Sequence, residues 1–120
     1  MKAEFIPYEQ ALELKELGFD DKCFAAMDMY SNIDYESEMY DFIRNSETVQ
    51  STWAALPLYQ QAFRWFREKY FLGHGINPYS LDAHLIDLED CIFYDIDDVY
   101  TYEEAELACV KKLIEIAKNK

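Results

Sequence analysis

A cluster of carboxylates late in the chain offers the first residues that could do chemistry. Asp95 and Asp97 stand two apart, and Asp87 precedes them. Carboxylate oxygens are the ligands that Ca²⁺ and Mg²⁺ prefer, and a calcium loop counted from Asp95 would end on Glu106 at position twelve. Position six is Tyr100, where that loop needs glycine for its sharp turn. A magnesium site built from the three aspartates stays open as an unspecific alternative, and we expect no bound metal or other cofactor.

Nucleophilic catalysis needs a nucleophile, a base and an orienting group in contact. The only histidines are His74, which lies between two glycines and is expected in an exposed turn, and His84, which begins a predicted strand. Neither forms a known signature with a cysteine, and Cys109 fits a small apolar residue in a helical core. We therefore expect no catalytic residues. An enzyme that acts on a small molecule through Asp or Glu and one of the two histidines is kept as an alternative.

The acidic residues are unevenly distributed, and the formal net charge is −13. Ten Asp or Glu and no Lys or Arg lie between Lys69 and Lys111, and five acids without a base lie between Lys22 and Arg44. This balance disfavours direct binding to nucleic acid or to anionic membranes, because such binding needs cations that displace counterions. A solvated acidic surface is the first interpretation. Imitation of nucleic-acid phosphates, directed at a host defence or DNA-binding protein, is the alternative.

The segment 58–72 interleaves aromatic and basic residues. At 100° per residue most of its rings fall on one core-facing stripe. That stripe consists of Tyr59, Ala62, Phe63, Phe66 and Tyr70. Arg64 and Arg67 line one flank and Lys69 leaves by the other, so the cations do not form one patch. Trp65 lies in a second apolar row, which either packs under a hairpin or is exposed for a partner; we favour packing.

The remaining elements follow from periodicity and from start and stop signals. Helices are predicted over 7–17, 57–72 and 101–118, and the last of them begins with a capping box of Thr101 and Glu104. Strands are predicted over 22–30, 84–88 and 91–96. Residues 38–45 are predicted to pair back as a strand, although a helix over 35–42 fits almost as well. Turns or loops are predicted over 31–38, 46–56 and 73–80.

The length of 120 residues fits one domain over 1–120. The order α-β-β-α-β-β-α predicts an α+β fold, with an antiparallel sheet covered by helices. No apolar run approaches the roughly 18 residues of a membrane span. Three widely spaced cysteines fit reduced thiols better than a disulfide framework, so we expect a soluble cytoplasmic protein.

Three stretches resemble a family of small uncharacterised proteins of phages, prophages and mobile elements of gut bacteria. They are FIPYEQALELKELGFD (5–20), PLYQQAFRWFREKY (57–70) and YTYEEAELACVKKLIEIAKNK (100–120). The resemblance implies a phage-encoded accessory protein in the cytoplasm of a bacterial host. It implies no activity and no catalytic residues. The three stretches coincide with the three predicted helices.

These observations together predict a non-enzymatic accessory protein that binds a host or phage protein. A second copy of the chain is an alternative partner, and an anti-defence role is one setting. The predicted partner-binding residues are Trp65, Asp87, Asp95, Asp97 and Asp98.

Overall fold

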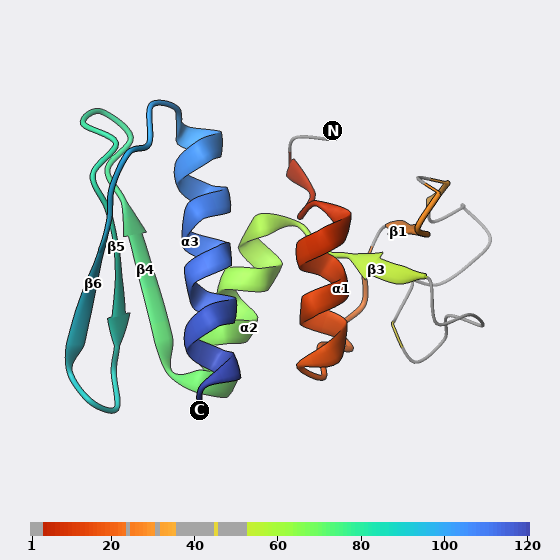
Figure 1. Cartoon of the computed structure of the whole chain (residues 1–120), viewed down its shortest axis with the longest axis horizontal. Helices are drawn as coiled ribbons and strands as arrows, with labels where there is room; N and C mark the ends of the chain where they lie inside the picture. The colour runs from red at the N-terminus through yellow and green to blue at the C-terminus, as the bar shows by residue number, and fades with distance from the viewer. Residues whose placement is uncertain (1–3, 24, 31, 36–44, 46–52) are drawn as a thin grey trace. The chain divides into compact units, whose positions relative to one another are not determined.

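A computed structural model describes residues 4–23, 25–30, 32–35, 45 and 53–120 (Figure 1). In this part of the chain, three helices and six strands follow one another in the order α-β-β-β-α-β-β-β-α. The strands form two three-stranded antiparallel sheets, which confirms the predicted α+β class. The residues group into two compact units, Met1–Leu58 and Tyr59–Lys120.

The helix of the first unit, α1 (Tyr8–Glu16), ends in a Schellman motif. Gly18 adopts a φ of 98°, its amide bonds the carbonyl of Lys15, and the amide of Phe19 bonds the carbonyl of Leu14. Phe19 and Leu14, the two positions between which this motif usually has an apolar contact, are both buried. The predicted helix and its glycine stop are confirmed, while Pro7 takes the N-cap position and not the first helical one.

The first sheet has the order β2-β1-β3, with β1 at Ala25–Met27, β2 at Ile33–Tyr35 and β3 at Ala54–Leu56. The turns predicted over 31–38 and 46–56 were therefore wrong where β2 and β3 lie. Asp28 explains the first case, because its carboxylate accepts hydrogen bonds from the amides of Tyr30 and Asn32 and closes a tight hairpin. The strand predicted over 38–45 lies, except for Asn45, outside the described residues.

The second unit contains α2 (Tyr59–Tyr70), β4 (Leu72–Ile76), β5 (Ala83–Asp87), β6 (Ile92–Ile96) and α3 (Tyr102–Lys118). Its sheet has the order β4-β5-β6. Helix α3 packs against all three strands and α2 packs against β4 and α3 (Figure 1). The hairpin of β5 and β6 was predicted. Strand β4 lies where a turn is predicted over 73–80, so that prediction is wrong for 73–76, and the chain leaves the strand only at Asn77.

The core of this unit lies between the sheet and the two helices. Helix α2 buries Tyr59, Ala62, Phe63, Trp65 and Phe66. Helix α3 buries Ala105, Cys109, Val110, Leu113, Ile114 and Ala117. The sheet contributes Leu72, Ala83 and Leu85, which are at most 5% exposed. The core-facing stripe predicted for α2 is thus confirmed, with Tyr70 at its half-buried end.

The capping box at the start of α3 is also present. The Thr101 hydroxyl accepts from the Glu104 amide at 3.1 Å. The Glu104 carboxylate accepts from the amide of Tyr100 at 2.9 Å, one residue before the cap amide that the motif predicts. Among the described residues, no helix combines the length and the apolar character that crossing a membrane requires.

Candidate functional site

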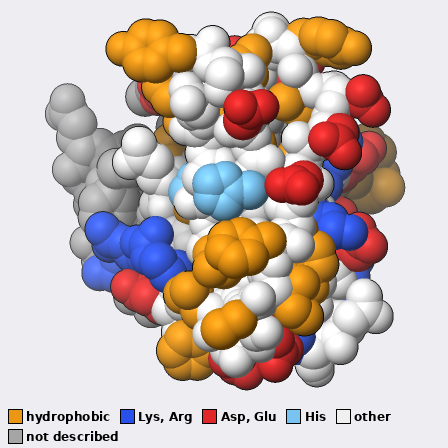
Figure 2. Space-filling view, turned by 90° about the vertical axis from the view of Figure 1, so that its left-hand side faces the viewer, with side chains coloured by type: hydrophobic (Ala, Val, Ile, Leu, Met, Phe, Trp, Pro, Cys, Tyr) orange, Lys and Arg blue, Asp and Glu red, His pale blue; other side chains and the backbone are white. Residues whose placement is uncertain are grey.

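The sheet of the second unit has one face packed on helices and one face turned away from them. Along β5 the side chains alternate, with Ala83, Leu85 and Asp87 buried, His84 exposed and Ile86 half-buried. The register places His84 opposite Asp95 and Ile86 opposite Phe93 on β6. We call the surface formed by these four side chains the outer sheet face. Figure 2 looks onto this side of the molecule, with histidine near the centre and both acidic and apolar side chains around it.

Glycines in β4 allow two of these side chains to lie across the neighbouring strand. A Cβ atom added to Gly75 would come within 2.5 Å of Cε1 and 2.8 Å of Nε2 of His84. A Cβ atom on Gly73 would come within 3.1 Å of the Cγ2 atom of Ile86. The imidazole therefore lies directly over the backbone of β4, where any larger residue would displace it.

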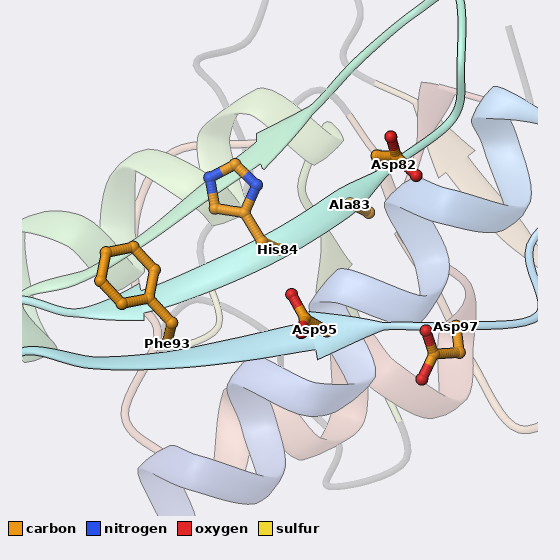
Figure 3. A pocket seen from close by; sticks show the side chains of 6 residues that line it. All are labelled: Asp82, Ala83, His84, Phe93, Asp95 and Asp97. Carbon is orange, nitrogen blue, oxygen red and sulfur yellow. The ribbon is translucent and has the colours of Figure 1, made fainter.

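An open pocket of about 460 Å³ lies on this face, lined by Asp82, Ala83, His84, Phe93, Asp95 and Asp97 (Figure 3). His84 comes from β5, whereas Phe93 and Asp95 come from β6 and Asp97 follows it. The phenyl ring lies at one end and the carboxylates of Asp82 and Asp97 lie at the other. The arrangement offers an apolar contact, one imidazole and three acceptors with negative charge in a shallow site.

The three aspartates of the magnesium site considered from the sequence do not lie on one face of the sheet. Asp95 and Asp97 line the outer pocket, whereas Asp87 is 2% exposed and points to the opposite side of the sheet. Successive side chains of a strand alternate between faces, so these three carboxylates cannot converge on one ion. Within the described residues no group of three or more His, Cys, Asp or Glu is placed to hold a metal. The magnesium alternative was wrong.

Asp87 instead stabilises the turn between β5 and β6. Its Oδ1 atom accepts from the amides of Glu89 and Asp90, and its Oδ2 atom lies 3.0 Å from Nζ of Lys120. Burial by itself raises the pKa of this carboxyl, but the hydrogen bonds from Lys120 and the turn amides outweigh it and hold the pKa below its ordinary value. Asp87 is a predicted partner-binding residue, but its carboxylate is buried and already bonded, so a partner protein cannot reach it in this conformation.

Trp65, another predicted partner-binding residue, is only 8% exposed. Its ring makes edge contacts with Phe66 and Tyr70 at centroid distances of 5.2 and 5.5 Å. The ammonium group of Lys69 lies 5.1 Å from its ring centroid, a cation–π arrangement. Trp65 is therefore packed and not exposed, although these contacts are with α2 itself and not with a hairpin. Of the five predicted residues, the ones that are exposed are Asp95, Asp97 and Asp98.

The histidines and cysteines lie in different environments from one another. His74 is in β4 and stacks on Phe63 with centroids 3.6 Å apart, so the exposed turn predicted for it was wrong. Its pKa is lowered by burial, by the charge of Arg67 and by His84. Burial and the charge of Glu106 raise the pKa of Cys109 to about 12, in keeping with a small apolar core residue.

Sequence reasoning missed the most exposed apolar part of the site. Phe93 is 67% exposed on β6, within the strand predicted over 91–96. The signal that could have identified it is the pair Gly73 and Gly75, because a strand with glycine on alternate positions presents an open, flat face.

In comparisons with protein-family models, with curated proteins and with solved structures, nothing matched the chain. The resemblance to phage and mobile-element proteins stays a prediction.

Proposed function

We propose that the chain is a non-enzymatic binding protein whose outer sheet face docks a cationic segment of a partner protein. In the phage or mobile-element setting that the sequence resemblance implies, the partner is a host or phage protein. The observation that carries the proposal is an exposed Phe93 ring and three carboxylates in one open pocket, on the sheet face that the helices of the second unit do not cover.

The apolar component supplies affinity. Phe93 is 67% exposed and stands opposite the half-buried Ile86 in the adjacent strand. Covering an exposed phenyl ring contributes about 2 kcal/mol. A large aromatic side chain is also a frequent anchor of a protein interface. This ring is therefore the residue from which we expect most of the binding energy.

The charges select the partner. Asp95 stands opposite His84, Asp82 and Asp97 lie at one end of the pocket, and no Lys or Arg occurs in the chain from 70 to 110. A partner segment that contains Lys or Arg is attracted over a long range, whereas an acidic segment is repelled. A second copy of the chain is disfavoured on this face for the same reason, because it would bring carboxylates against carboxylates.

Nucleic-acid mimicry is the competing function for an acidic surface. A mimic needs a row of negative charges, whereas this face places a phenyl ring, an isoleucine and a histidine among its carboxylates. These groups suit a protein segment with both apolar and cationic side chains. An enzyme acting through Asp or Glu and His84 is less well supported, because the pocket that holds them is open and shallow and not a deep site with convergent groups.

A random-peptide display library presented to the immobilised protein tests the proposal. We expect enrichment of peptides that combine Lys or Arg with one large apolar residue. For a synthetic peptide of that type, Phe93→Ser should weaken binding by about 30-fold, the equivalent of about 2 kcal/mol. The double variant Asp95→Asn, Asp97→Asn should weaken binding and flatten its dependence on salt.

Tyr79→Ser is the matched control, because Tyr79 is 97% exposed but lies in the connection between β4 and β5, outside the pocket lining. Enrichment of acidic or uncharged peptides, or an equal loss of binding in Tyr79→Ser, would contradict the proposal. Capture of host DNA-binding proteins that duplex DNA displaces would establish mimicry in its place.

A further inference from the structure

A second pocket of the same unit lies between α2, β4 and the first turns of α3. It has a volume of about 310 Å³ and is separate from the outer sheet face. Its polar lining consists of Gln60, Arg64, Arg67, His74, Tyr102 and Glu106. No residue of this lining belongs to the docking site proposed above.

Two of the chain's three arginines meet at this pocket. Arg64 and Arg67 are three residues apart on α2, so their side chains leave the same side of the helix. Both are exposed at the pocket mouth. The pocket contains one carboxylate, Glu106, against two guanidinium groups, so its lining keeps an excess of positive charge in a strongly acidic chain.

The inner part of the pocket is formed by a stacked pair of rings, His74 and Phe63. The imidazole of His74 stacks on the Phe63 ring at 3.6 Å with an angle of 14° between the planes. Burial, Arg67 and His84 lower the pKa of His74, so the ring is neutral at pH 7 and offers one donor and one acceptor. The stacked pair thus supplies a flat wall with a hydrogen-bonding edge, which a small ligand can meet without adding charge.

We propose that this pocket binds the oxyanion group of a small phosphorylated or carboxylated molecule, held by Arg64 and Arg67. Guanidinium groups bind such oxyanions through paired hydrogen bonds of fixed geometry. Tyr102 and Gln60 add neutral donors at the rim. Glu106 accepts from a hydroxyl or amino group elsewhere in the ligand and disfavours ligands that are anionic at both ends. The volume suits a small metabolite and not a polymer.

The proposal is tested on the full chain by titration with inorganic phosphate, ribose 5-phosphate and acetate at constant ionic strength. We expect saturable movement of the His74 ring signals in NMR spectra, together with heat in calorimetry. A response to phosphate esters without one to acetate assigns the site to phosphate, and the reverse assigns it to carboxylates.

Charge variants identify the groups responsible. Arg64→Gln and Arg67→Gln should each weaken binding of the active probe at least about tenfold, as expected for loss of a charge-assisted hydrogen bond. Arg67→Lys should recover only part of the affinity, because an ammonium group lacks the paired donors. Glu106→Gln should strengthen binding of inorganic phosphate severalfold, since it removes the opposing charge.

Lys69→Gln is the matched control, because it removes the same charge from the same helix outside the pocket lining. It should change the affinity less than about twofold. Absence of any saturable response at millimolar concentrations of all three probes would overturn the proposal, as would equal weakening in Lys69→Gln and Arg67→Gln. Phe93→Ser should leave this binding unchanged, so the result is independent of the function proposed for the outer face.

Discussion

At the scale of single residues, identical side chains have different roles because the pleat of the sheet separates them. Asp87 and Asp95 both belong to the hairpin of β5 and β6. Asp87 faces the helices and is bonded to a lysine and two amides, whereas Asp95 stands exposed opposite His84. Residue type and spacing predicted a common acidic surface. The face on which each residue lies decides which of them a partner can reach.

The bonds of Asp87 lead to a prediction about stability and pH. Asp87→Ala should lower the free energy of unfolding by about 2 kcal/mol at pH 7, because the turn amides and Lys120 lose a charged acceptor. The lowered pKa means that this contribution is complete above the unfolded value near 3.9 and disappears as the pH falls through the folded pKa. Urea unfolding of wild type and variant between pH 7 and pH 2 measures it.

The control for this prediction is Lys120→Gln, which removes the ion pair and keeps the turn. The Lys120 side chain is partly exposed, so Lys120→Gln should lower the free energy of unfolding by less than Asp87→Ala does. A difference between wild type and Asp87→Ala that stays constant down to pH 2 would show that the carboxylate charge is not what stabilises the turn.

At the scale of elements, the sequence predicted the helices well and the short strands poorly. The stripe of α2 and the capping box of α3 are long or specific patterns, and both are present. Strands β2 and β3 have three residues each, too few for alternation to be recognised. Strand β4 contains two glycines and a histidine, which resemble turn residues. Its strand conformation comes from pairing with β5, which local sequence does not encode.

The glycines of β4 give a prediction about the outer sheet face. Gly75→Ala places a methyl group where the His84 ring lies. Because the clash is with the far end of a side chain, the ring should swing away and the fold should persist, at a cost of about 1 kcal/mol. We expect the His84 ring signals to shift in NMR spectra and the midpoint of urea unfolding to fall by about 0.3–1 M, which is the equivalent of that cost.

Gly73→Ala is the comparison for that variant, since its new methyl group meets Ile86 at the milder distance of 3.1 Å. It should leave the signals of His84 in place. Adding His84→Ser to Gly75→Ala should restore the stability that Gly75→Ala loses. A Gly75→Ala protein whose His84 signals are unchanged would mean that the imidazole does not lie over β4 in solution.

At the scale of the whole molecule, charge and apolar burial act against each other. The chain has 51% hydrophobic residues, enough for a core in each compact unit. Its net charge of −13 opposes compaction, because the excess acidic side chains repel one another. The candidate docking site could be predicted only in part from these totals. They indicated an acidic surface, and the sequence named Asp95, Asp97 and Asp98, but the exposed Phe93 depends on which face of β6 the helices cover.

The net charge predicts that salt stabilises the protein. Screening weakens the repulsion among the carboxylates more than it weakens a single ion pair such as that of Asp87 and Lys120, because the repulsive charges are far more numerous and more exposed. Raising NaCl from about 0.02 to 0.5 M should therefore raise the melting temperature by about 4 °C, the equivalent of about 1 kcal/mol.

The triple variant Asp95→Asn, Asp97→Asn, Asp98→Asn should melt higher than wild type at low salt and respond less to added salt. Melting curves of both proteins at several NaCl concentrations measure this, and a wild type that salt destabilises would show that ion pairs outweigh repulsion. If the variant is more stable yet loses peptide binding, the acidic face is maintained at the expense of stability, as expected for a surface kept for a partner.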